Sequence, residues 1–172
     1  MVQFATGNDR SGPVELWPVE TGPDARVHFR YADGVEVRLR FPDSEPHRGP
    51  KLGAIFVGAD CKIEINRNKF TTNPVDFVQD GPDPEVAKKW EGDGWVAKGH
   101  VQNWFDCIAS RETPNADVEI GHRTASLCQL IDITRQLQRR LRWDPVAESF
   151  VDDEAANALL DRPRHPGWEL PT

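Results

Sequence analysis

The amino-acid sequence predicts an α+β fold, in which the first half of the chain forms an antiparallel β-sheet and the second half forms helices. In the first half, apolar and polar residues alternate, which is typical of strands that bury one face. In the second half, apolar residues recur every three or four positions, which is typical of amphipathic helices. Strands that come first and helices that follow favour an α+β protein.

A first β-hairpin is predicted over residues 26–41, where two alternating stretches flank the turn sequence Ala32-Asp33-Gly34. A two-residue Asp-Gly loop would set apolar residues opposite polar ones. A three-residue loop with Gly34 in the left-handed conformation sets like opposite like. The expected pairs are Tyr31 with Val35, Phe29 with Val37 and Arg30 with Glu36.

A second hairpin is predicted over residues 54–66 by the same reasoning. Its apolar residues match across the two strands only if Ala59-Asp60-Cys61 forms the loop. The residues that this register matches are Ile55, Val57, Ile63 and Ile65. Cys61 then occupies a loop position that glycine adopts with the least strain. If its φ is positive, the cysteine side chain destabilises the loop by about 1 kcal/mol.

The other segments of the first half are a strand and two loops. Val14–Trp17 is predicted to be an edge strand that Pro18 ends, because proline cannot donate to a sheet ladder. Residues 42–50 and 72–84 are rich in Pro and Asp and are predicted to be loops.

The second half is predicted to contain a helix from about Lys98 to Ser110, a longer helix that begins near Asp117 as its N-cap, and a short helix over 153–160. The core-facing residues of the first are Val101, Trp104, Phe105 and Ile108. Those of the second are Leu127, Leu130, Ile131, Leu137 and Leu141. Arg135, Arg139 and Arg140 should complement the dipole in its last turns. The tail over 161–172 is expected to be extended.

Composition and charge exclude several classes of protein. The chain has 172 residues and a net charge of −7, which argues against nucleic acid or anionic lipid as the main partner. No apolar run approaches the ~18 residues of a membrane helix, and the first residues do not form a secretory signal. Three cysteines without CxxC spacing are expected to stay reduced. These observations predict a soluble cytoplasmic protein.

Motifs for a self-contained active site are absent from the sequence. It contains no GxGxxG, no GxxxxGK[ST], no HExxH, no GxSxG and no paired-cysteine zinc spacing. We interpret Cys107, His122 and Cys128 as a coincidence rather than a metal site. We therefore expect no metal and no catalytic residue of a recognisable type.

Three polar clusters remain as candidates, each with a structural alternative. His100, Asn103 and Cys107 share one helix face, so they form either a wall of a polar pocket or an ordinary solvated face. Residues 117–123 offer either a helix N-terminus with Arg123 as an anion clamp, or a simple N-cap. The polar strand face binds either an acidic partner or another subunit, or is simply solvated. Its residues are Arg26, His28, Arg30, Arg38 and Arg40.

Several runs resemble the C-terminal end of Gfo/Idh/MocA-family oxidoreductases, in particular the planctomycete-type branch. These runs are GHVQNWFDCIASRETPNADVEIGHRTASLCQL, LRWDP and DDEAANALLDRPRHPGWELP. The runs SGPVELWP, RYADGVEV and GAIFVGADCKIEINRN fit the sheet of the same domain. The resemblance implies one domain over residues 1–172, with an open, mostly antiparallel sheet over 13–71 and helices over 98–160 packed on one side of it.

The resemblance also implies a division of labour. Full-length members bind NAD(P) in an N-terminal Rossmann domain, and the family's catalytic Lys, Asp and His precede the part that this chain resembles. Residues 1–7 look like the end of the catalytic helix. No catalytic or cofactor-binding position maps onto this chain, so by itself it should bind no dinucleotide and catalyse nothing. We expect the substrate-side portion of an oxidoreductase that transfers a hydride to or from a sugar or polyol.

The resemblance places His100, Asn103 and His122 in motifs of this branch, beside Arg123, and makes these four side chains candidates for the substrate cleft. It further implies a homo-oligomer through the sheet face and a Rossmann domain as a possible partner, with no nucleic acid and no membrane. Two alternatives stay open: a non-catalytic scaffold or ligand-binding protein, and a stand-alone hydrolase or lyase that uses His100 and Asp106.

Overall fold

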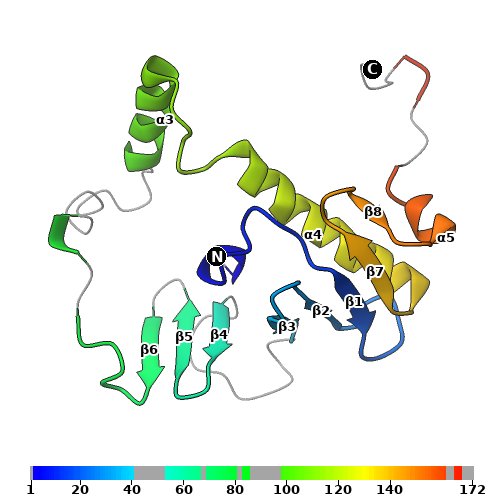
Figure 1. Cartoon of the computed structure of the whole chain (residues 1–172), viewed down its shortest axis with the longest axis horizontal. Coiled ribbons are helices and arrows are strands. Elements are labelled where there is room, and N and C mark those ends of the chain that lie inside the picture. Colours follow the sequence, from blue (N-terminus) through cyan, green and yellow to red (C-terminus); the bar gives the residue numbers. More distant parts are fainter. Residues whose placement is uncertain are drawn as a thin grey trace. The chain divides into compact units, whose positions relative to one another are not determined.

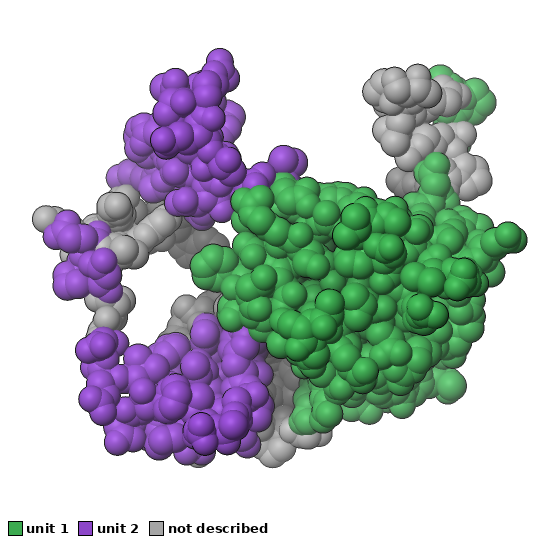
Figure 2. All heavy atoms as spheres, viewed as in Figure 1, with its two compact units in different colours: residues 1–40, 119–172 green, residues 41–118 purple. Residues whose placement is uncertain are grey.

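The computed structural model describes residues 2–40, 53–66, 69–80, 83–85, 98–161 and 165–167. The chain forms two compact units, coloured separately in Figure 2: unit 1 contains residues 1–40 and 119–172, and unit 2 contains residues 41–118. Both contain an antiparallel sheet (Figure 1), which confirms the predicted α+β class. The predicted loop over 42–50 and most of the predicted tail over 161–172 lie outside the described residues.

Unit 1 contains a five-stranded sheet with the strand order β3-β2-β1-β7-β8. The strands are β1 (Glu15–Pro18), β2 (Val27–Arg30), β3 (Glu36–Arg38), β7 (Leu141–Asp144) and β8 (Ser149–Phe150). The prediction of an edge strand at β1 is wrong, because β1 lies between β2 and β7. Pro18 is tolerated there because β7 pairs only with Glu15 and Leu16, so Pro18 lies beyond that ladder.

The first hairpin has the predicted three-residue loop. Phe29 pairs with Val37 and Arg30 pairs with Glu36, while the N–H of Tyr31 donates to the carbonyl of Val35 over 2.9 Å. Gly34 has a φ of 90°, as the left-handed position of this loop requires. The register therefore follows from matching apolar and polar faces, as the sequence predicts.

Helix α4 (Val118–Leu137) packs its inner face on the five-stranded sheet of unit 1. Its most buried residues are Leu130, Ile133 and Thr134, and the Thr134 hydroxyl donates to the carbonyl of Leu130 over 2.7 Å. From the sheet and α5, the core receives Leu16, Val27, Phe29, Tyr31, Leu141, Trp143, Phe150 and Ala156. The predicted stripe residues Leu127, Ile131 and Leu137 border this core.

Helix α4 ends before the predicted boundary. Gln138 follows its last residue with a φ of 52°, and its side-chain amide exchanges two hydrogen bonds of 2.8 Å with the backbone of Gly22. Arg139 and Arg140 therefore follow the helix, and Leu141 belongs to β7. Leu141 fits both the helical spacing of the preceding residues and the alternation of a strand, so spacing alone placed it wrongly.

Two short helices complete unit 1: α1 (Val2–Ala5) and α5 (Glu154–Asn157). Helix α5 is shorter than the predicted 153–160. Asp153 caps it by accepting the N–H of Ala156 over 3.0 Å. The Arg139 guanidinium and that N–H together hold the pKa of Asp153 below its usual value.

Unit 2 contains a three-stranded sheet of β4 (Gly53–Val57), β5 (Lys62–Asn66) and β6 (Lys69–Asn73). The predicted register of its first hairpin is wrong by one residue, because Phe56 rather than Val57 pairs with Ile63. The loop closes through a 2.9 Å hydrogen bond from the N–H of Gly58 to the carbonyl of Cys61, and Cys61 has no positive φ. Strand β6 also extends into the predicted loop over 72–84.

Helix α3 (Lys98–Ser110) of unit 2 has the predicted bounds, but its apolar stripe is not part of a core. Val101, Trp104, Phe105 and Ile108 are 48%, 56%, 53% and 45% exposed. The prediction that Trp104 is a core residue is therefore wrong. Within the described stretches of the chain, no helix is long and apolar enough to cross a membrane.

Candidate functional site

Helix α3 positions two of the predicted site residues, His100 and Asn103, in its first turns. Together with Trp104 and the segment that follows the helix, they line an open pocket of about 400 Å³, which we call the α3 pocket. Its lining residues are His100, Val101, Asn103, Trp104, Pro114 and Ala116. Residues three and four apart are neighbours on a helix surface, so His100 lies beside Trp104 rather than on the opposite face.

Asn103 fixes the second wall of the α3 pocket. Its Oδ1 accepts the backbone N–H of Asn115 over 2.9 Å, and its Nδ2 lies 3.8 Å from the Sγ of Cys107. The first contact holds the segment with Pro114 and Ala116 against the helix, so Asn103 shapes the pocket through its own hydrogen bonds. Sequence spacing placed Asn103 on a polar face, and the structure shows what it binds there.

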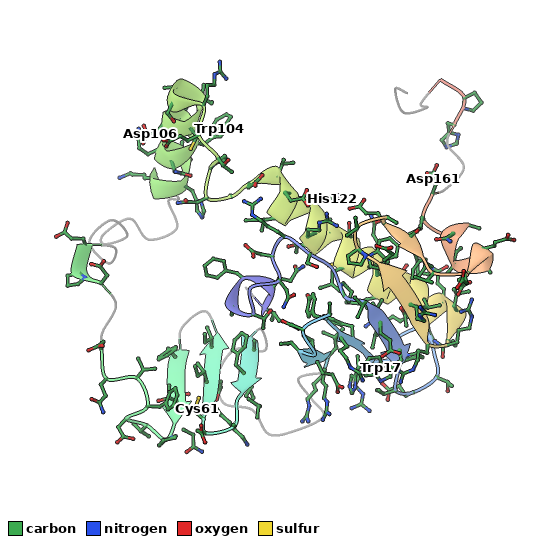
Figure 3. All side chains as sticks on the ribbon, in the orientation of Figure 1. Trp17, Cys61, Trp104, Asp106, His122 and Asp161 are labelled. Atoms are coloured by element: carbon green, nitrogen blue, oxygen red, sulfur yellow. The ribbon has the colours of Figure 1, made fainter. Side chains whose placement is uncertain are left out.

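Trp104 gives the α3 pocket an aromatic surface. Its ring lies 5.3 Å from that of Phe105, measured between centroids, and Figure 3 shows Trp104 on α3 with its side chain directed away from the helix axis. An exposed indole beside an imidazole and an amide offers apolar area together with polar groups. Ligand pockets are commonly lined by apolar and aromatic side chains, with a few polar groups that fix the orientation of the ligand.

His100 and Asp106 do not form an acid–base pair. Six residues of helix separate them by about 9 Å along the axis and by about 120° around it. The Asp106 carboxylate instead accepts the side-chain amide of Gln102 over 2.7 Å. The geometry thus gives no support to a stand-alone hydrolase or lyase built on these two residues.

His122 and Arg123 lie in unit 1, on α4, and both contact Glu148. The Oε1 of Glu148 lies 2.7 Å from His122 Nε2 and 2.9 Å from an Arg123 nitrogen. Arg123 also donates to Glu119 and to the carbonyl of Pro145, each over 2.7 Å. Glu148 has a φ of 50° and lies in the turn between β7 and β8, as does Pro145. Because both residues belong to that turn, these contacts hold the turn on the helix. They favour a structural role for Arg123 over an anion clamp.

The four side chains predicted for one cleft thus fall into two pairs. His100 and Asn103 belong to the α3 pocket of unit 2, whereas His122 and Arg123 belong to the β7–β8 turn of unit 1. Where the structure describes the chain, no cluster of three or more His, Cys, Asp or Glu residues could hold a metal ion.

Comparison with known protein families decides what kind of domain this is. The family described as "Oxidoreductase family, C-terminal alpha/beta domain", which is the C-terminal domain of Gfo/Idh/MocA oxidoreductases, matches residues 2–170. The chain belongs to the Gfo/Idh/MocA oxidoreductase family. No curated protein and no solved structure matches it.

In this Gfo/Idh/MocA domain, a further polar surface covers the side of the five-stranded sheet opposite the core. We call it the arginine face. Cross-strand pairing places its residues in two rows, Glu36-Arg30-Glu15-Arg142 and Arg38-His28-Trp17, and Arg140 lies against Trp17. The sequence predicted the part on β2 and β3. It missed Arg140, which was assigned to the end of the long helix, and Arg142, which was assigned to no helix or strand.

Trp17 is the centre of the arginine face. The guanidinium carbons of Arg140 and Arg30 lie 4.4 and 5.3 Å from its ring centroid, and His28 meets it edge-on at 6.0 Å. Burial lowers the pKa of His28, and the positive charge of Arg38 lowers it further. The electrostatic environment of His28 therefore disfavours another positive charge.

Proposed function

We propose that this domain forms the substrate side of an NAD(P)-dependent oxidoreductase that acts on a sugar or a polyol. The observation that carries the proposal is the α3 pocket, where an exposed indole lies beside the His100 and Asn103 side chains. A sugar has apolar C–H faces and a ring of hydroxyl groups, which match an aromatic wall and polar neighbours respectively. Membership of an oxidoreductase family supports the class of reaction.

The described residues do not fit the dinucleotide itself. Dinucleotides bind where a Gly-rich turn links a parallel strand to a helix N-terminus. Both described sheets are antiparallel, and the sequence has no GxGxxG. We therefore propose that the Rossmann-domain partner holds the nicotinamide, which supplies the hydride chemistry, and we assign the described residues of this domain to substrate binding.

Within the α3 pocket, each side chain has a distinct part. Trp104 would stack on the substrate ring, and the His100 imidazole would exchange a hydrogen bond with a substrate hydroxyl. Asn103 is a positioning residue, because its Oδ1 is already bonded to the N–H of Asn115 and keeps the second wall in place.

Titration of the 172-residue chain with monosaccharides and polyols, followed by tryptophan fluorescence and calorimetry, tests this proposal. Trp104→Ala should abolish binding. Phe105→Ala is the matched control, because Phe105 is equally exposed on the same helix but does not line the pocket. Equal binding by both variants, or no binding of any sugar or polyol by the unaltered chain, would overturn the proposal.

We also propose that the protein is a homo-oligomer that associates through a sheet face, and that a Rossmann domain is its other partner. The three-stranded sheet of unit 2 supports the first part, because one of its faces carries Phe56, Ile63, Ile65 and the 55%-exposed Phe70. Light scattering should give a dimer or tetramer at tens of micromolar, and a clean monomer would count against self-association.

A further inference from the structure

The arginine face contains more positive than negative charge, although the whole chain has a net charge of −7. Three of its four arginines share two glutamates: Glu15 binds Arg140 over 2.8 Å and Arg30 over 3.3 Å, and Glu36 binds Arg38 over 2.7 Å and Arg30 over 3.7 Å. Arg142 lies directly across from Glu15 in the pairing of β1 with β7. Among the described residues, Arg142 makes no ion pair of its own.

The arginines of this face are also held in position before any partner binds. Arg140 and Arg30 stack on Trp17 while each contacts Glu15, so their side chains have already lost much of their rotational freedom. Guanidinium groups that are preorganised in this way bind carboxylates with a smaller entropic penalty than mobile lysines would. The carboxylate that Arg30 and Arg140 already hold is that of Glu15, so these two arginines form the fixed centre of the face.

We propose that the arginine face is a docking surface for an acidic segment of a partner protein. Its carboxylates would pair with Arg142, which makes no ion pair among the described residues, and with Arg38, whose side chain is 61% exposed although it contacts Glu36. The segment would lie across Trp17 and His28. This inference is independent of the substrate proposed for the α3 pocket.

Charge also decides between the possible occupants. A two-fold pairing of this face with itself would bring together two surfaces that each carry more positive than negative charge, which is repulsive. A long nucleic acid would extend beyond the face, over a chain with a net charge of −7. A short acidic protein segment interacts within a Debye length of about 8 Å, and so responds mainly to the arginines beneath it.

The probe is a short fluorescein-labelled peptide of alternating Glu and Gly, with a Gln/Gly peptide of equal length as its uncharged match. Fluorescence anisotropy with the full 172-residue chain should show binding of the Glu peptide only, weakened by added salt. The double variant Arg38→Glu/Arg142→Glu should weaken binding by about tenfold or more. Lys62→Glu/Arg111→Glu, which makes the same change of net charge on unit 2, should leave it unchanged.

Circular dichroism and thermal melting of both double variants show whether each is folded, and only folded variants are compared. A single variant, Arg142→Gln, gives a second readout if the double variant does not fold, since Arg142 makes no ion pair among the described residues. Equal binding of the Glu and Gln peptides would overturn the proposal. So would equal losses in the face variant and its control. Self-association of the chain that only the face variant abolishes would assign the surface to a second copy instead.

Discussion

Units 1 and 2 differ in how they use their apolar residues. Among the residues that the structure describes, the whole hydrophobic core belongs to unit 1, where a helix covers one side of a five-stranded sheet. In unit 2, none of the described residues is buried, and the apolar stripe of α3 is about half exposed. The comparison teaches that alternation and helical spacing show which side of an element is apolar, but not whether anything covers that side.

The largest expected effect separates the two units by a matched pair of substitutions. Phe29→Ala in β2 should lower the free energy of unfolding by about 3–5 kcal/mol, because it leaves a cavity in the core. Phe70→Ala in β6 should change it by less than about 1 kcal/mol, because that ring is 55% exposed. Hydrogen exchange read by mass spectrometry reports each unit separately. A larger loss for Phe70→Ala would break the comparison.

The next effect concerns the contacts that hold the β7–β8 turn in unit 1. Arg123→Gln should cost about 1–2 kcal/mol, since it removes bonds to Glu119, Glu148 and the carbonyl of Pro145. His122→Gln should cost less than about 1 kcal/mol, because that side chain is exposed. Urea unfolding measures both. Equal costs would mean that Arg123 does not act through the turn.

The two hairpin loops offer a smaller and sharper contrast. Gly34→Ala should destabilise unit 1 by about 1–2 kcal/mol, because Gly34 has a φ of 90°. Gly58→Ala in unit 2 should be neutral or stabilising by less than about 1 kcal/mol, because Gly58 has no positive φ and its nearest new contact would be 3.6 Å away. Thermal melting compares them, and a reversed order would refute the loop assignments.

The smallest effect is a pH dependence that belongs to unit 1. The Arg139 guanidinium and the Ala156 N–H depress the pKa of Asp153 in the folded state. The resulting stability is therefore present above the usual pKa of 3.8 and is lost as the pH falls through the lower folded value. Asp153→Asn keeps a capping side chain but removes the charge, so it should flatten the acid limb of a melting-temperature profile. An unchanged acid limb would contradict this.

How much could be predicted depended on how strictly the sequence distinguishes the two faces of each element. The residue 26–41 hairpin has charged residues on one face only, so a single register satisfies it. In β4 the run Gly-Ala-Ile-Phe-Val is apolar on both faces, so either Ile55 or Phe56 could lie on the face that carries Ile63 and Ile65. The predicted register put Ile55 there, whereas the structure has Phe56 there. A local pattern of this kind does not distinguish the two registers.

The sequence anticipated only part of how the candidate side chains are grouped, and whether they bind a substrate stays a prediction. His100 and Asn103 were found because helical spacing brings them together, and the structure joins them in one pocket. Trp104 was assigned to the core, since exposure depends on what covers a helix and not on its period. Arg140 and Arg142 were missed because their place beside Trp17 depends on β7 pairing with β1 across more than half of the chain.

That pairing has a consequence for synthesis on the ribosome. Glu15 in β1 pairs with Arg142 in β7, so one edge of β1 stays unpaired until about 125 further residues have been synthesised. At usual translation speeds, this delay is on the order of ten seconds. Throughout that time the growing chain exposes an unpaired strand edge, to which a neighbouring nascent chain or a chaperone has access.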